Sequence, residues 1–192
     1  MPLIGALQEY LRGRVRQTLD PGSRMRAAVL VCLTGNRPDQ LSTLLLKRSE
    51  TVGRHAGEMA FPGGMIEAGD AGPEDAALRE AEEEVGLARD RVRVLGRLEE
   101  LVTATSGVHV TPVVGHAEGF GKLRPDPVEV AGIVEVPLRL LRDPERKSWE
   151  TFVLPEGLFR VPVYRVPERV WGATARILQT LLEALDATPG QR

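Results

Sequence analysis

The sequence has little of what marks a secreted, membrane-bound or nucleic-acid-binding protein. Its one cysteine, Cys32, excludes an internal disulfide and is expected to be a buried strand residue in a reducing compartment. No apolar run reaches the length of a membrane span, and the N-terminus has no signal-peptide pattern. The formal net charge of −2 gives no electrostatic reason to expect a nucleic-acid polymer or an anionic membrane as partner. We therefore expect a cytoplasmic protein.

The chain of 192 residues is long enough for one domain with a substantial core, and no internal repeat or linker divides it. The apolar periodicity and the positions of glycine and proline predict helices at 3–19, 73–85, 137–141 and 174–185. They predict strands at 26–35, 41–49, 91–103, 108–117, 130–136, 149–154 and 160–164. We expect an α/β (α+β) domain over residues 1–192, with a core at about 26–185 and a mixed sheet flanked by helices.

The predicted helix at 73–85 carries a cluster of like charges. Glu80, Glu82, Glu83 and Glu84 lie beside a single cation, Arg79. Carboxylates three and four residues apart on a helix repel each other, by a few tenths of a kcal/mol per pair. Because such a cluster costs stability, it calls for a ligand that offsets the repulsion.

The helical phase separates these carboxylates by their distance from the packed face. At about 100° per residue, a buried stripe is predicted that contains Ala77, Leu78, Ala81 and Val85. Glu84 lies about 20° beyond its edge, Glu80 about 60° and Glu83 about 120°, whereas Glu82 points to solvent. Oxygens gathered at a half-buried rim suit a hard divalent cation such as Mg²⁺. The alternative is a solvated acidic helix face.

The residues around the helix resemble the Nudix box, the signature of hydrolases that split nucleoside diphosphates linked to another group. The match comprises Gly64, a loop with Asp70, and "REAEEEVGL" at 79–87, after "FPGG" at 61–64. Two features depart from the pattern: Asp70 replaces the usual Glu, and the stretch from Gly64 to Arg79 is one residue longer than the common spacing. Both lie in the loop, so the spacing of the carboxylates on the helix still matches the family pattern. The resemblance implies the Nudix fold, a mixed β-sheet sandwiched between α-helices.

A second motif resembles the coenzyme A pyrophosphatase branch of that family. In "LLLKRSETVGRHAGEMAFPGG" (44–64), Arg48, Ser49, Gly57, Glu58 and the segment 61–64 match. The basic stretch between them matches in part, because Gly53 takes a place where a basic residue is expected. The segments 106–115, 136–141 and 170–178 also resemble that branch. The resemblance implies hydrolysis of the diphosphate of coenzyme A (CoA) to 3′,5′-ADP and 4′-phosphopantetheine. It also allows acylated or oxidised CoA as substrate, and a monomer or a homodimer as the active form.

The resemblance also implies the roles of individual residues. Glu80, Glu83 and Glu84 are the expected catalytic and Mg²⁺-binding carboxylates, the backbone carbonyl of Gly64 is a further metal ligand, and Mn²⁺ is expected to substitute. Arg79 is expected to orient a glutamate. The general base stays open among the box glutamates and four carboxylates outside the box: Glu58, Glu99, Glu100 and Glu129. The expected substrate-binding residues are Arg48, Arg54, Glu58, Phe61 and Gly63, with the arginines on phosphate.

Two alternatives remain at this level. One is a Nudix hydrolase for another nucleoside diphosphate derivative, such as ADP-ribose or NADH. The other is a non-catalytic nucleotide-binding module, which the intact set of box glutamates disfavours. His109 is expected to be a packed, hydrogen-bonded histidine and Trp171 a core residue.

Overall fold

A computed structural model describes residues 3–16, 18–50, 56–154 and 157–189. The main sheet is built around β1 (Arg26–Thr34), whose neighbour β7 (His109–His116) runs parallel to it over its whole length. The strand order is β3-β2-β1-β7-β5, from β3 (Met59–Ala60) and β2 (Ser42–Arg48) to β5 (Arg93–Arg97). Three more strands pair antiparallel beside this path: β4 (Gly63–Met65) on β1, β6 (Leu101–Val102) on β7 and β8 (Val130–Pro137) on β2. The predicted mixed sheet is therefore confirmed.

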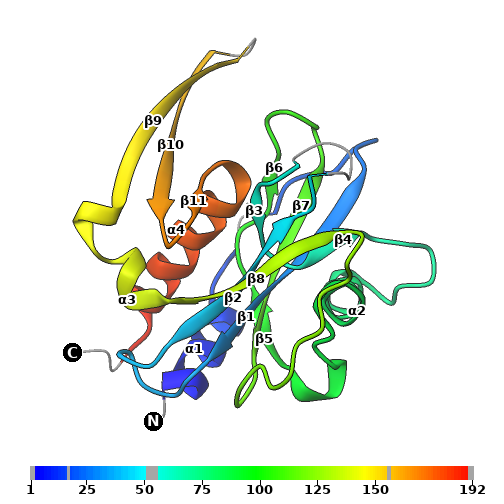
Figure 1. Ribbon diagram of the computed structural model, residues 1–192, viewed down its shortest axis with the longest axis vertical. Coiled ribbons are helices and arrows are strands. Elements are labelled where there is room, and N and C mark those ends of the chain that lie inside the picture. The colour runs from blue at the N-terminus through cyan, green and yellow to red at the C-terminus, as the bar shows by residue number, and fades with distance from the viewer. Residues whose placement is uncertain (1–2, 17, 51–55, 155–156, 190–192) are drawn as a thin grey trace.

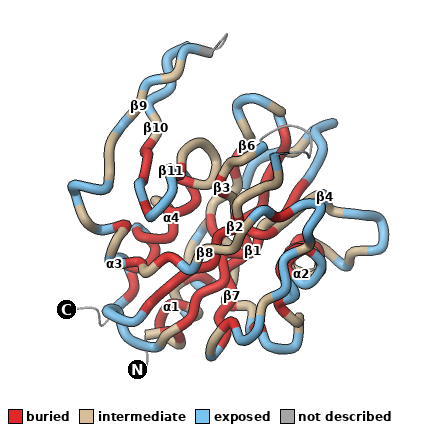
Figure 2. Tube along the Cα trace, in the orientation of Figure 1, coloured by how far each residue is buried: buried red, intermediate tan, exposed pale blue. Residues whose placement is uncertain are grey.

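Helices cover both faces of this sheet, as Figure 1 shows. Helix α2 (Pro73–Val85) packs on one face, against the side of β1 that carries Ala28, Leu30 and Cys32. Helices α1 (Leu3–Gly13) and α4 (Gly172–Ala187) lie on the other face, where Val31 and Leu33 point. Alternate residues of one strand thus enter two separate cores, which explains the nearly continuous apolar run of β1. In Figure 2 the buried segments follow the middle of the sheet and the inner sides of the helices.

The sheet divides next to β1. On the edge of β1 opposite β7, the C-terminal end pairs with β2, through Leu33 and Thr34, while the N-terminal end pairs with β4. The segment 59–65 fills the opening, because its first residues pair with β2 and its last residues pair with β1. The "FPGG" sequence therefore lies where two strands of the sheet separate, beneath α2.

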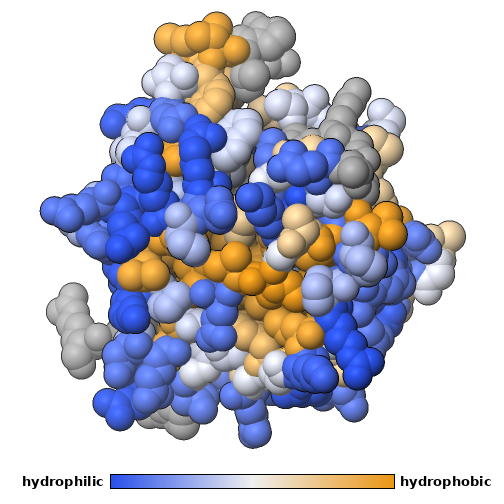
Figure 3. All heavy atoms as spheres, in the orientation of Figure 1, coloured by the Kyte–Doolittle hydropathy of each residue, from blue (hydrophilic) through white to orange (hydrophobic). Residues whose placement is uncertain are grey.

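A smaller sheet packs on α4 and extends from this body. It consists of β9 (Lys147–Leu154), β10 (Gly157–Arg165) and β11 (Arg169–Val170), and the β9–β10 hairpin projects from the molecule in Figure 1. Val153, Leu158 and Phe159 are exposed on it, and apolar colour gathers at its projecting end in Figure 3. A short helix, α3 (Leu138–Leu141), and a 3₁₀ turn at Pro144–Arg146 connect β8 to this hairpin.

The first helix was predicted at 3–19 and is shorter in the structure. Helix α1 ends at Gly13, and two apolar residues that were counted in its period are exposed: Val15 completely and Leu19 by 40%. Glycine is a weak helix former, and the Arg14 guanidinium is held across the sheet by Glu99 and by the carbonyl of Arg97. The tertiary contacts of Arg14 therefore draw the chain away from the helix axis.

The predicted strand at 91–103 is interrupted. Residues Arg89–Arg91 form a 3₁₀ turn, β5 and β6 are separate strands, and the pairing of β5 with β7 has a register shift between Val94 and Gly96. The other predicted elements are found within about three residues of the predicted bounds. None of the helices in the described part of the chain is long and apolar enough to cross a membrane.

Candidate functional site

Helix α2 has the predicted bounds because its sequence marks both ends. Pro73 occupies the first turn, where its missing N–H costs nothing, and Glu74 and Asp75 follow near the positive end of the helix dipole. Gly86 ends the helix in the left-handed conformation, φ 69°, with its N–H donating to the Glu82 carbonyl. The buried stripe differs in one place from the prediction: Ala76 is buried, whereas Leu78 is only partly buried. Small side chains on this face let α2 lie close to the sheet.

The box carboxylates follow the predicted gradient of burial. The Glu84 side chain is 5% exposed, Glu80 is 16% exposed and Glu83 is 59% exposed. Glu82 is half exposed and pairs with Arg89, at 3.2 Å between Oε2 and Nε. The phase of the helix was therefore sufficient to rank Glu84, Glu80 and Glu83, whereas Glu82 is slightly less exposed than Glu83.

Glu84 is a nearly buried carboxylate with little compensation for its charge. Its Oε2 accepts a hydrogen bond from the Gly63 backbone N–H at 2.9 Å, and Nη1 of Arg48 lies 4.0 Å from its Oε1. Burial raises the pKa of Glu84 to about 7; the Gly63 hydrogen bond opposes this shift, and the charge of Glu80 adds to it. Burial also raises the pKa of Glu80. Arg48, 4.0 Å from Glu84, and Arg79, 2.9 Å from Glu80, do not fully offset the effect of burial on these two carboxylates.

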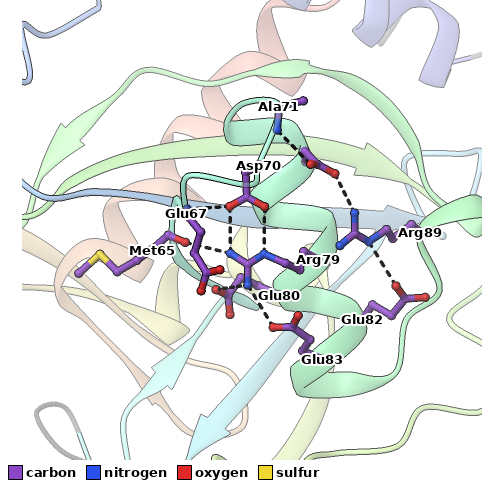
Figure 4. Close-up of polar contacts among 10 residues, drawn as sticks. Met65, Glu67, Asp70, Ala71, Arg79, Glu80, Glu82, Glu83 and Arg89 are labelled. Carbon is purple, nitrogen blue, oxygen red and sulfur yellow. Dashed lines mark hydrogen bonds and ion pairs between the residues drawn. The ribbon is translucent and has the colours of Figure 1, made fainter.

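Arg79 organises the loop and the helix around these carboxylates (Figure 4). Its Nε and Nη2 bind the two oxygens of Asp70, each at 3.0 Å, and Nη2 also donates to the Met65 carbonyl. Its Nη1 donates to Glu80 at 2.9 Å and to Glu83 at 3.1 Å. The hydrogen bonds from Arg79 lower the pKa of Asp70. The prediction that Arg79 orients a glutamate is confirmed, and Asp70, which replaces the expected Glu, is its bidentate partner.

The oxygens on this rim fit a hard divalent cation by their chemistry. Oε1 of Glu84 and Oε2 of Glu80 accept no hydrogen bond from a described residue, and Glu80 and Glu84 lie one helical turn apart. A Cβ on Gly64 would lie 2.4 Å from Oε1 of Glu80, so the backbone approaches this carboxylate as closely as glycine permits. Glu83 instead turns to Arg79. No three Asp, Glu, His or Cys side chains of the described residues already converge in metal-binding geometry. The donors therefore suit Mg²⁺, and binding would need Glu80 to adjust.

A distant loop brings Glu129 to the same place. The backbone N–H groups of Arg124 and Asp126 donate to the last carbonyls of α2, those of Val85 and Glu84, at 2.9 and 2.8 Å. Ser49 N–H then donates to the Glu129 carbonyl at 2.8 Å, beside Arg48. The charge of Glu129 raises the pKa of both Glu80 and Glu84, so its carboxylate is close to both. No sequence motif marked the 124–129 loop as part of the site.

The other candidates for a general base lie elsewhere or act through the backbone. Glu99 is paired with Arg14 at 3.1 Å, and Glu100 lies 3.3 Å from Nε2 of His109 and accepts from Leu19 N–H. Glu58 is half-buried, and its backbone carbonyl accepts from Arg48 N–H at 2.9 Å. The charge of Glu129 is coupled to both Glu80 and Glu84.

The expected substrate-binding residues are found in different environments. Arg48 is partly exposed next to Glu84, as a phosphate-binding cation requires. Phe61 is 3% exposed in the main core, and Gly63 donates its N–H to Glu84. Arg54 lies outside the described residues. Arg48 therefore places a cation at Glu84, and segment 61–64 adds the Gly63 backbone donor and is anchored by Phe61.

Three further residues can be placed. His109 is buried as predicted, but neither ring nitrogen makes a hydrogen bond of good geometry. Trp171 is only partly buried and stacks on Phe152, with ring centroids 5.3 Å apart, so it belongs to the hairpin rather than to the main core. Cys32 is buried as predicted, and burial raises its pKa to about 12, which keeps the thiol protonated.

Two adjacent glycines give a matched test of this geometry. A Cβ at Gly63 would lie 2.4 Å from the Ala28 carbonyl oxygen, which is backbone, so Gly63→Ala is expected to lower the free energy of unfolding by about 1–3 kcal/mol. The three atoms nearest to a Cβ at Gly64 all belong to the carboxylate of Glu80, which is the end of a flexible side chain. Gly64→Ala is therefore expected to keep the melting temperature of the metal-free protein and to lose most of the rise produced by Mg²⁺. Thermal melts with EDTA and with Mg²⁺ check both variants, and a full Mg²⁺ shift in Gly64→Ala would contradict the placement of Glu80.

Comparisons with known proteins agree with this geometry. A model described as the NUDIX domain matches residues 24–155. The chain is 35% identical over 187 residues to a Yersinia enterocolitica protein described as the uncharacterized Nudix hydrolase NudL, over 94% of this chain and 93% of that protein. Among solved structures, a MutT/nudix family protein from Enterococcus faecalis covers 95% of this chain and 74% of its own, with TM-score 0.59 and 16% identity.

A second solved structure has a ligand in its description. The NUDIX domain of Shewanella oneidensis NrtR, described as complexed with ADP ribose, covers 92% of this chain and 97% of its own. Its TM-score is 0.54 and its identity is 17%. At such low identity, these two solved structures show the fold of this chain and do not identify its substrate.

Proposed function

This chain belongs to the Nudix family of hydrolases, which act on phosphorus-containing anhydrides, and we propose that it hydrolyses the diphosphate of CoA. The products would be 3′,5′-ADP and 4′-phosphopantetheine. One observation carries the choice of substrate: the motif at 44–64 that resembles the CoA pyrophosphatase branch leads directly into the site, since it contains Arg48 beside Glu84 and ends at Gly64 beside Glu80.

The residues of the rim would hold the cation that this family generally uses. Glu80 and Glu84 would be the main ligands of Mg²⁺, with Mn²⁺ as a substitute, and Glu83 and the Gly64 carbonyl would complete the set. When bound, the cation supplies charge neutralisation to the nonbridging oxygens of the diphosphate. The buried position of Glu84 supports this role, because a carboxylate with a raised pKa gains most from an added cation.

The protein's own groups would perform the remaining steps. Arg48 binds a diphosphate oxygen with a guanidinium that is already within 4.0 Å of Glu84, and its buried Nε makes no hydrogen bond to a described residue. Arg54 and Glu58 bind other parts of CoA from the same segment. Glu129 accepts the proton of the attacking water, since it is the carboxylate outside the box whose charge is coupled to both Glu80 and Glu84.

The experiment that tests this function is a substrate comparison. Purified protein with Mg²⁺ or Mn²⁺ is incubated with CoA, ADP-ribose and NADH at equal concentrations, and the products are separated by chromatography. We expect Mg²⁺-dependent release of 4′-phosphopantetheine from CoA, with kcat/KM at least tenfold above the values for the other two compounds. Cleavage of ADP-ribose with CoA left intact would reject the CoA assignment and leave a Nudix hydrolase of another specificity. Binding without cleavage of any of the three would favour a nucleotide-binding module.

A further inference from the structure

A cavity lined by arginines lies on the far side of α2 from the carboxylate site. It has a volume of about 640 Å³ and is formed by the end of α1, the following residues and the edge strand β5. Figure 1 shows α1 and β5 together in the lower part of the molecule. Glu74 lines it from α2, and at about 100° per residue the side chain of Glu74 points about 120° away from that of Glu80. The cavity is therefore separate from the proposed metal site.

Four arginines line this cavity, although the protein as a whole has a formal charge of −2. Two of them are neutralised by carboxylates. Arg97 forms a bidentate pair with Glu74, and Arg14 forms one with Glu99 at 3.1 Å. The other two, Arg12 and Arg16, form no ion pair with any described residue. Glu74 is close enough to interact with the charge of Arg16 but is already paired with Arg97, so two arginines of the cavity remain without an ion pair among the described residues.

Arg16 also has a buried donor without an acceptor. Its Nε is inaccessible to solvent and makes no hydrogen bond. An unsatisfied donor on a charged group costs more than one on a neutral group, and such atoms in folded proteins generally have a partner. An oxyanion in the cavity would supply the missing acceptor, and the planar guanidinium can bind it through two parallel N–H groups.

We propose that this cavity is a second, non-catalytic site for a small molecule that carries a phosphomonoester. Such a group is doubly charged near neutral pH, which matches the two uncompensated cations. The volume exceeds the needs of a single phosphate ion and lies within the range of small-molecule sites, and Leu11 and Val94 offer apolar contact to an organic part.

Calorimetric titration of the full-length, metal-free protein in EDTA tests the site. Inorganic phosphate and glycerol 3-phosphate are the probes, and glycerol is the uncharged control. Saturable binding is expected for both anions and none for glycerol, with glycerol 3-phosphate the tighter ligand. Inorganic phosphate binding as tightly as glycerol 3-phosphate would reject an ester-specific site, and absence of saturable binding would reject the site itself.

Matched variants locate the binding. Arg16→Gln is expected to weaken the Kd of glycerol 3-phosphate by tenfold or more, and Arg12→Gln, on an exposed side chain, by a smaller factor. Arg139→Gln, which removes an exposed arginine on α3, and Glu84→Gln should both bind as wild type does. An equal loss in Arg139→Gln would indicate general charge attraction. A loss in Glu84→Gln with unchanged binding in Arg16→Gln would place the anion at the carboxylate site, and either outcome would overturn the proposal.

Discussion

Glu84→Gln is expected to lower the hydrolysis rate by about 10³-fold, which corresponds to roughly 4 kcal/mol of lost transition-state stabilisation. Glutamine has nearly the shape of glutamate and can still accept the 2.9 Å hydrogen bond from Gly63, so the change removes the charge and little else. A metal-dependent diphosphate hydrolysis depends on that charge to hold the cation. Steady-state kinetics over a range of Mg²⁺ concentrations measure the loss.

Glu82→Gln is the matched control for this prediction. Glu82 lies two residues away on the same helix, is half exposed and contacts Arg89 at the surface, where an ion pair contributes little. Its removal is expected to leave kcat/KM within about twofold of wild type. Similar losses in the two variants would indicate that the acidic face acts only through its overall charge.

Glu84→Gln has the opposite effect on the stability of the metal-free protein, which it is expected to raise. Because burial raises the pKa of Glu84 from 4.5 to about 7, the folded state retains a proton in this pH range that the unfolded chain has released. The free energy of unfolding therefore falls as the pH rises from about 4.5 to 7, by up to roughly 3 kcal/mol from this group. Glu84→Gln is expected to lack this contribution and to exceed wild type in stability at pH 8 in EDTA. Urea unfolding at pH 5 and pH 8 checks this, and an identical pH dependence in both proteins would contradict it.

Arg79→Lys is expected to lower the hydrolysis rate by about 10–100-fold, the usual effect of removing a group that orients metal ligands. Lysine keeps the positive charge but cannot bind both oxygens of Asp70 while donating to Glu80 and to the Met65 carbonyl. The loop from Gly64 to Gly72 would then be held less firmly against α2. The measurement is kcat together with the Mg²⁺ concentration for half-maximal rate, which should rise.

Arg89→Lys is the control for Arg79→Lys. Arg89 also contacts two carboxylates of α2, Asp75 and Glu82, but it is more exposed and touches none of the proposed metal ligands. It is expected to retain nearly full activity.

Asp70→Asn should act through the same network as Arg79→Lys. The rate of the double variant should therefore fall by much less than the product of the two single losses. Independent effects would show that Asp70 and Arg79 do not work as a unit.

The sequence by itself determined the helix that carries the box glutamates. The bounds of α2 follow from Pro73 and Gly86, which act on the nearest turn of the backbone, and the order of burial of Glu84, Glu80 and Glu83 follows from helical geometry. The mixed sheet between helices was also predictable, because the alternation of elements restricts the architecture. These are local properties, which residues close to each other in the chain determine.

Only the tertiary structure decided the contacts between distant segments. Periodicity predicted a helix to residue 19, but Arg14 is held by Glu99 and by the Arg97 carbonyl, and the chain leaves the helix at Gly13. Glu129 was one of several open candidates for the general base, and its place near the box glutamates follows from the loop that contains Asp126, which binds the end of α2. The same folding brings Arg16 to the β5 edge. Each of these contacts joins residues about 40 to 85 positions apart, and their proximity depends on strand pairing and helix packing that no local pattern encodes.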